Sequence, residues 1–305
     1  MTQGPGLAGA LLVGISYAKA LAFALEKPLI AVNHLEGHIH AVLLAQRQSS
    51  GEELQFPVLA LVVSGGHTHL YLAEEKGVGW TYANIGHTRD DAAGEAFDKV
   101  AKLLGLGYPG GPIIDRLAGH GDATAVRFQT SQIKHRDRRD RGLAHDDSAD
   151  RPRFDFSYSG IKTAVLRYVE ANDLKQAIEA RRRALANIDK PTLEDYLRLC
   201  DRQTLDLVAS FQRSIVEDLV TKTLAAAREY DVRTVFVSGG VAANRELRRT
   251  FEREANNEGL PVFFPSRTLS TDNAAMIAAA AFPKFLAGNF VAMDFSAEAG
   301  MKLGA

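Results

Sequence analysis

The chain has 305 residues, of which 46% are hydrophobic and 24% are charged. At about 150 residues per domain this length predicts about two domains, and the composition excludes disordered and fibrous proteins. The 36 Lys and Arg residues against 37 Asp and Glu give a net charge of −1, so a polyanion such as RNA would need a local basic patch. The single cysteine, Cys200, excludes an intrachain disulfide and a thiolate metal site. We expect a cytoplasmic protein with no membrane partner.

An apolar segment, residues 6–25, opens the chain after a Gly-Pro-Gly turn. Its length would span a bilayer, but Lys19 in its middle and several small residues favour a buried helix. No charged region or small-residue cleavage site precedes it, so we expect no signal peptide. A buried helix this close to a terminus is unusual, and we therefore expect a segment to be missing upstream.

The elements that follow alternate between short apolar strands and helices. Strands are predicted over 28–32, 58–63, 69–73, 80–85, 234–237 and 261–264, and helices over 34–45, 92–104, 161–169, 174–186, 205–230, 244–256 and 274–285. One more helix is predicted after the turn over 108–112. The strands from 58 to 85 are typical of an antiparallel meander. The short strand-helix-strand connections near the C-terminus predict parallel strands. The fold class is α/β.

Two basic clusters interrupt this pattern. Residues 134–153 hold seven Lys and Arg against five Asp without a hydrophobic period, which predicts an exposed loop. Arg181, Arg182 and Arg183 form the second cluster, on a predicted helix. Each cluster is either a solvated face or a contact for RNA phosphates.

The tetrapeptide Val-Ser-Gly-Gly occurs twice, over 63–66 and 237–240, each time at the end of an apolar strand. Consecutive glycines let the backbone approach a ligand, and their free N–H groups can bind an anion. A helix follows the second copy and adds its N-terminal amides. Neither copy matches a P-loop or Rossmann motif. The repeat predicts a nucleotide or phosphate site, with two plain turns as the alternative.

A histidine pair, His34 and His38, has the i, i+4 spacing that places both imidazoles on one helix face, where they can bind one cation. The motif is HLEGH rather than HExxH, so Glu36 is not in the general-base position of a zinc protease. The best third ligand is Asp272, at a predicted helix start. Two histidines and a carboxylate suit iron(II), with zinc also possible. The alternative is two surface histidines and an N-cap aspartate.

Seven motifs in order give the chain a family resemblance from about residue 2 to residue 285. They are GPGL, NHLEGH, VSGGHT, DDAAGEAFDK with YPGG, FSYSGIKT, VSGGVAANRELR and STDNAAMIA. This series resembles the TsaD family, the tRNA threonylcarbamoyladenosine synthases. The resemblance implies an actin-like ATPase fold, shared with sugar kinases and Hsp70, with two lobes around a nucleotide cleft. The lobes would be 1–56 with 275–305, and 57–274 with a helical and basic insertion at about 131–230.

The resemblance also implies an activity, an acyltransferase reaction. The threonylcarbamoyl group would pass from threonylcarbamoyl-AMP to N(6) of the adenosine beside the anticodon, position 37, in tRNAs that read codons starting with adenine. A divalent metal, iron(II) or zinc, would be held by His34, His38 and Asp272, and would polarise the reacting oxygens. The residues implied for the adenylate are Val62, Val63, Ser64, Gly65, Gly66, Asp98, Gly111 and Asn244. The implied partners are tRNA, a TsaB-like paralogue and a TsaE-like ATPase.

The start of the chain departs from the family pattern. The family opens with an ETSCDET-like strand-turn-strand that is absent here, and Met1 stands where the family often has valine. We therefore expect a mis-assigned start, an incomplete first lobe, and an apolar helix and strand edges left without neighbours.

Three other functions compete with the transferase. A non-catalytic or inactive fragment of the same family is consistent with the missing opening. A metalloprotease is disfavoured because no glutamate occupies the base position of the histidine pair. An actin-fold kinase or ATPase would need an acidic N-terminal phosphate loop and would leave HLEGH unexplained.

Overall fold

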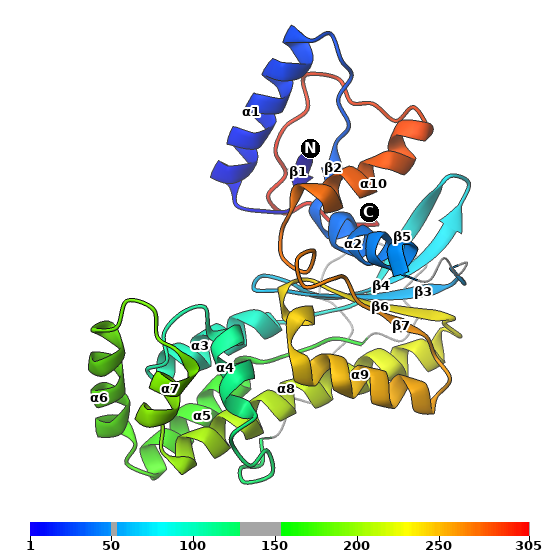
Figure 1. The fold of residues 1–305 in the computed structure, drawn as a ribbon. Helices are drawn as coiled ribbons and strands as arrows, with labels where there is room; N and C mark the ends of the chain where they lie inside the picture. The colour runs from blue at the N-terminus through cyan, green and yellow to red at the C-terminus, as the bar shows by residue number, and fades with distance from the viewer. Residues whose placement is uncertain (50–53, 129–153, 305) are drawn as a thin grey trace.

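The computed structural model describes residues 1–49, 54–128 and 154–304. Its centre is a five-stranded sheet in the order β5-β4-β3-β6-β7, with helices on both faces (Figure 1). The strands are β3 (Val58–Val63), β4 (Thr68–Lys76), β5 (Gly79–His87), β6 (Thr234–Ser238) and β7 (Val262–Phe263). The β3, β4 and β5 strands pair antiparallel, while β6 pairs parallel with β3 and β7. The predicted meander and the predicted parallel strands are both confirmed.

The central strand β3 explains the two layers of helices. All six of its residues are fully buried, as a continuous apolar run predicts for a strand covered on both faces. Because side chains alternate along a strand, Leu59, Leu61 and Val63 pack into the larger core on one face. Val58, Ala60 and Val62 pack on the other face. The sheet is therefore the wall between two separate apolar cores.

The larger core is closed by the helices of the middle of the chain. They are α3 (Ala93–Leu103), α4 (Gly110–Ala118), α5 (Ser159–Ala171), α6 (Lys175–Ala186), α7 (Leu193–Leu199), α8 (Arg202–Glu229) and α9 (Arg245–Asn257), with the short 3-10 helix η2 (Gly240–Ala243). All but α7 and η2 were predicted from periodicity. Thr192 and Asp195 form a capping box at the start of α7, which is the sequence signal for this short helix.

The opposite face of the sheet carries α2 (His34–Ser49), and α10 (Ala274–Leu286) packs on α2. Two short strands, β1 (Thr2–Gly4) and β2 (Val32–Asn33), pair parallel beside them. The predicted strand over 28–32 is shorter than expected, because only Leu29, in a bridge to Val291, and Val32 pair. The Asn33 side chain accepts a hydrogen bond from the Leu35 amide, which starts α2 where the sequence predicts.

The first helix, α1 (Ala8–Ala24), forms as predicted, but the prediction that it is buried is wrong. Only Leu11, Ile15 and Ala22 are buried. The exposed apolar side chains on and beside it, here called the α1 surface, are Leu7, Leu12, Val13, Tyr17, Leu21, Phe23 and Leu25. Because α1 is apolar on all sides, packing one face of the helix against the protein leaves the apolar side chains of its other faces exposed to solvent. Among the described residues no helix is long and apolar enough to cross a membrane.

Candidate active site

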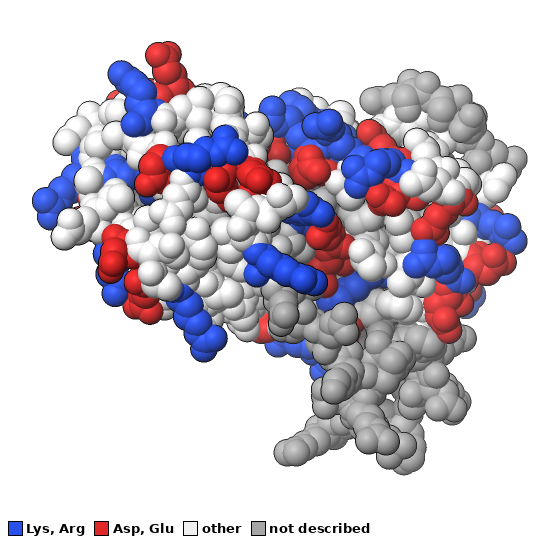
Figure 2. All heavy atoms as spheres, turned by 90° about the horizontal axis from the view of Figure 1, so that it is seen from below, with Lys and Arg blue, Asp and Glu red and all other residues white. Residues whose placement is uncertain are grey.

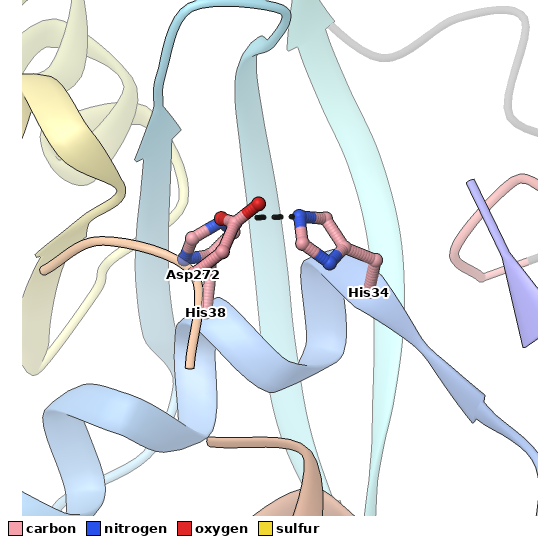
Figure 3. Close-up of side chains that lie close together, drawn as sticks. All are labelled: His34, His38 and Asp272. Atoms are coloured by element: carbon pink, nitrogen blue, oxygen red, sulfur yellow. Dashed lines mark ion pairs between the residues drawn. The ribbon is translucent and has the colours of Figure 1, made fainter. Parts of the chain in front are cut away.

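Three side chains that are distant in the sequence meet at the junction of α2 and α10. His34 and His38 lie one turn apart at the start of α2, and Asp272 reaches them from the loop before α10 (Figure 3). The Asp272 Oδ1 atom lies 3.5 Å from His34 Nε2 and 3.2 Å from His38 Nε2. The two imidazole rings are 4.8 Å apart in an edge-to-face arrangement. The i, i+4 spacing thus gives the predicted shared face, and the structure brings the predicted third residue to it.

His38 is the member of this group that a purely structural role explains least. Its side chain is 1% exposed, and neither ring nitrogen has a well-aligned hydrogen-bond partner, although Nε2 lies close to Asp272. A buried polar group without a partner costs about 1–3 kcal/mol. A divalent cation would satisfy it, since imidazole and carboxylate are ordinary metal ligands. Within the described part of the chain, no other group of His, Cys, Asp and Glu side chains could surround one ion.

The protonation states favour cation binding. Burial, followed by the proximity of His38, lowers the pKa of His34. The close contact with His38, with further help from the positive charge that His34 and His38 can carry, lowers the pKa of Asp272 despite partial burial. A neutral His34 imidazole and an ionised Asp272 carboxylate are the forms that bind a metal. The chemistry of these three residues therefore fits the divalent metal that the sequence predicts at this site.

Gly37, inside the HLEGH motif, lies where α10 packs on α2. A Cβ atom at Gly37 would lie 2.7 Å from Ile277 Cδ1 and 3.3 Å from Met276 Cγ on α10. Glu36, by contrast, is buried and pairs with Lys284 of α10 at 3.3 Å. It points away from the site, as predicted.

Replacing Gly37 with valine should weaken metal binding at least about tenfold, because the added methyl groups push α10 and Asp272 away from α2, and shifts of supporting residues cost about that much. Titration with Zn²⁺, followed calorimetrically, measures the change. Gly14→Val in α1 is the control, since a Cβ there meets nothing within 4 Å. Equal affinity in the two variants would contradict this account.

The two predicted glycine loops lie against each other at the ends of β3 and β6. Gly239 has a φ of +91°, and a Cβ there would lie 2.3 Å from the Val63 carbonyl oxygen. A Cβ on Gly94, at the start of α3, would lie 2.5 Å from the Ser64 carbonyl oxygen. In contrast, Gly65 and Gly66 are exposed and have open space around them. Gly239 and Gly94 thus allow neighbouring segments to pack closely on the backbone of residues 63–64. Gly65 and Gly66 leave the rest of that loop accessible.

The residues predicted to hold an adenylate have structural partners of their own. Asp98 accepts a hydrogen bond from the Gly110 amide at 2.7 Å, at the start of α4. Gly110 is the glycine that the helix packing requires, since a Cβ there would lie 2.6 Å from the Ala101 Cβ; sequence reasoning missed it and singled out Gly111, which has open space.

Asn244 caps α9 by accepting from the Leu247 amide, and its Nδ2 donates to Gln212 Oε1 at 2.8 Å. Gln212 in turn lines a cavity of about 520 Å³ between α4, α8 and α9. Arg245 and Asp115, paired at 3.0 Å, line the same cavity. Of the predicted adenylate residues, Asn244 is therefore linked to this cavity through its hydrogen bond to Gln212.

In the second basic cluster, fewer arginine side chains are exposed for contact with RNA phosphates than predicted. Arg181 is 2% exposed and donates to the carbonyls of Leu104 and Leu199 and to Thr204, so its prediction as a surface RNA contact is wrong. Its guanidinium instead ties α6 to the α3 end and the α8 start. Arg182 and Arg183 are exposed and pair with Glu179. The cluster over 134–153 lies outside the described residues, and on the face in Figure 2 the described basic and acidic side chains are interspersed.

Two further histidines, which were not predicted from the sequence, lie beside His34, His38 and Asp272, here called the metal group. The His67 ring lies 6.2 Å from that of His34, and the His67 amide donates to Ser64 Oγ at 3.2 Å. His69 follows on β4, with its ring 5.7 Å from that of His67. The alternation HTH at the start of a strand is the signal, since it places both rings on one face.

The pKa of His69 is lowered to about 4, mainly by burial and then by His67 and His87. Between pH 4 and about 6.5 the unfolded chain binds this proton and the folded chain does not, so folding stability falls as the pH falls through that window. His69→Gln should flatten the stability profile there by about 1–3 kcal/mol. Urea titrations of the metal-free chain at stepped pH measure it, with His120→Gln as the control. A slope unchanged by His69→Gln would contradict the assignment.

The comparisons with known proteins identify the family of the chain. The family model described as TsaD, tRNA N6-adenosine threonylcarbamoyltransferase, matches residues 1–279. A tRNA N6-adenosine threonylcarbamoyltransferase of Koribacter versatilis is 71% identical over 303 residues, covering 99% of this chain and 79% of the relative. One from Geobacter metallireducens is 49% identical over 278 residues, covering 91% of this chain and 67% of the relative.

Solved structures resemble the fold at low sequence identity. Full-length HypF, in a phosphate- and nucleotide-bound form, superposes with a TM-score of 0.55 at 14% identity, covering 88% of this chain and 45% of HypF. HypF of T. kodakarensis gives 0.51 at 14% identity, covering 90% and 39%. The chain thus shares an α/β fold with HypF, which is consistent with the actin-like ATPase fold that the resemblance implies. With the family match and the close relatives, the chain belongs to the tRNA N6-adenosine threonylcarbamoyltransferases, a family of transferases.

Proposed function

We propose that this chain transfers the threonylcarbamoyl group from threonylcarbamoyl-AMP to N(6) of adenosine 37 in tRNAs that read codons starting with adenine, with help from a divalent metal. One observation supports this most: the buried His38, whose ring nitrogens have no well-aligned hydrogen bond, lies with His34 around Asp272, beside an open glycine loop. His67 connects the two parts, with its ring near His34 and its amide on Ser64. A cation site and an anion site thus adjoin.

In the proposed reaction the N(6) amine attacks the carbamoyl carbon, the bond from that carbon to the phosphate oxygen breaks, and AMP leaves. The amine loses one proton, which the released phosphate can accept. The open amides of Gly65 and Gly66, with Ser64, suit the phosphate. The Asp98 oxygen that does not accept from Gly110 suits the ribose hydroxyls. No residue is assigned as a general base, because AMP is a good leaving group.

The metal would be held by His34, His38 and Asp272, with iron(II) proposed and zinc as the other choice. When bound, it would act as a Lewis acid on the carbamoyl or phosphate oxygens and anchor the threonyl carboxylate. The three side chains are already close together in the structure: both histidines lie on α2, and Asp272 reaches them from the loop before α10.

A metalloprotease is the weaker candidate. Such an enzyme needs a carboxylate base beside the metal-bound water, and Glu36 is buried against Lys284 instead. An inactive family member is the other alternative, and it differs from our proposal only in the transfer itself.

The α1 surface supports the proposed partnership. Seven large apolar side chains are exposed on and beside one helix, and an exposed apolar patch of this kind marks an interaction surface. We propose that it takes the TsaB-like paralogue, and that tRNA and a TsaE-like ATPase complete the system in the cytoplasm. Leu12→Glu with Tyr17→Glu should abolish co-elution with the paralogue, while Lys27→Glu leaves it unchanged. Co-elution by the double variant would refute this placement.

A transfer assay tests the proposal. The chain, with both partners, threonylcarbamoyl-AMP labelled in its threonyl part and tRNA, should place label in tRNA. Asp272→Ala should reduce the rate at least about 100-fold, the size of effect that loss of a metal ligand brings. His120→Ala, at an exposed site far from the metal group, should leave the rate unchanged. Equal rates for wild type and Asp272→Ala would refute the role of the metal group.

A further inference from the structure

A row of imidazoles leads away from the metal group along the edge of the sheet. It runs from His34 through His67 and His69 to His87, with successive ring centres 6.2, 5.7 and 6.2 Å apart. His69 on β4 and His87 on β5 are directly opposite in the strand register. The pairing of β4 with β5 therefore holds His69 and His87 next to each other.

The sheet order places this row and Asn244 on opposite sides of the Ser64–Gly66 loop. This loop follows β3, which lies between β4 and β6. The β6 side leads through Gly239 to Asn244 and the cavity, while the β4 side leads to His67 and His69. A donor bound toward β6 leaves the β4 and β5 side for the acceptor.

The row has the properties of a surface that takes a flat, uncharged ring. His69 and His87 are half-buried, and the His87 side chain is 36% exposed. The His69 ring stacks on the buried Tyr71, 5.7 Å away and nearly parallel at 7°, which fixes its orientation. Because the pKa of His69 is about 4, the ring is neutral near pH 7. Proteins recognise unpaired RNA bases by stacking them on aromatic side chains, histidine included.

We propose that His69 and His87 form a stacking platform for the acceptor adenine of the RNA, beside the reacting groups. This inference rests on the proposed function and deepens it, since it places the second substrate. His69 is a binding residue for the base, held by Tyr71 and by the contact of its Nδ1 with Asn84 Nδ2 at 3.2 Å. The Ser64–Gly66 loop and the metal group lie at the end of the row formed by His34 and His67. A base on the platform therefore presents its exocyclic amine toward them.

The test measures binding of two anticodon stem-loop RNAs, one with adenosine at position 37 and one with an abasic ribose there, to the chain with its partners and without donor. Wild type should bind the adenosine RNA about tenfold more tightly than the abasic RNA, the scale of one stacked base. His69→Ala should lose that preference and leave abasic binding unchanged. His69→Phe should keep most of it, and the distant His120→Ala should keep all of it.

Two further measurements distinguish a contact between His69 and the base from a structural role of His69. Metal affinity and thermal midpoint, measured on His69→Ala, should stay within about threefold and a few degrees of wild type. Equal binding of both RNAs by wild type, binding of neither, or a loss in His69→Ala that is the same for both RNAs would each overturn the platform. Because no donor and no turnover are involved, failure of the transfer reaction leaves this result readable, and failure of the platform leaves the transfer assay intact.

Discussion

Replacing His38 with leucine should abolish binding of divalent metal and, at the same time, leave the metal-free chain as stable as before or more stable by about 1 kcal/mol. The reason for the second effect is that His38 is buried with both ring nitrogens poorly satisfied, and an apolar side chain of similar size removes that cost. The first effect follows from the loss of one of three ligands. Metal present at about 100 times its dissociation constant stabilises the wild type by about 2.7 kcal/mol, and the variant should lose this gain.

Urea unfolding with and without Zn²⁺ measures both effects on the same samples. Ile39→Leu, on the neighbouring buried position of α2, is the control for repacking without loss of a ligand. If His38→Leu destabilises the metal-free chain by several kcal/mol, His38 is a structural residue with a partner that the account has missed. If it keeps the metal-dependent gain, His38 is not a ligand.

Replacing Gly239 with alanine should destabilise the chain by about 3 kcal/mol or more, whereas the same change at the adjacent Gly240 should cost less than about 1 kcal/mol. Gly239 has a positive φ, and its Cβ would meet the Val63 backbone at 2.3 Å. Strain of this kind costs about 1–3 kcal/mol, and a clash in a packed region adds a similar amount. Gly240 has neither feature, since a Cβ there meets nothing within 4 Å.

The pair distinguishes a packing role from a ligand role for the second glycine loop. Denaturant midpoints of the two variants give the difference in stability directly. Equal midpoints would contradict the close packing of the β6 loop against the end of β3. A preserved fold in Gly239→Ala with the same affinity for an adenylate analogue would show that the loops need not be in contact.

Sequence reasoning predicted the sheet well because its signals are local. The run over 58–63 is apolar at every position and coincides with β3, and the helix predicted over 92–104 is found as α3, over Ala93–Leu103. The metal group was found because two of its residues share one helix face and the third begins a helix. Each of these signals needs only the chain within a few residues.

Contacts between distant segments could not be read in the same way. Arg181 looks like its exposed neighbours Arg182 and Arg183 in sequence, and only the packing of α6 against α3 and α8 buries it. Gly110 is required because a Cβ there would meet the Phe97 carbonyl oxygen at 2.7 Å and the Ala101 Cβ at 2.6 Å, both on α3. The burial of α1 was predicted from its apolar composition, but composition does not say which faces have neighbours.

The most direct test of the account is to identify the modified nucleoside after the transfer reaction. The chain, alone and extended upstream, is incubated with its partners, threonylcarbamoyl-AMP and tRNA, and the tRNA is digested and its nucleosides are weighed by mass spectrometry. We expect threonylcarbamoyl on N(6) of adenosine 37 with the wild-type chain, and none when Asp272→Ala replaces it. The absence of this nucleoside with both versions of the wild-type chain would contradict the account.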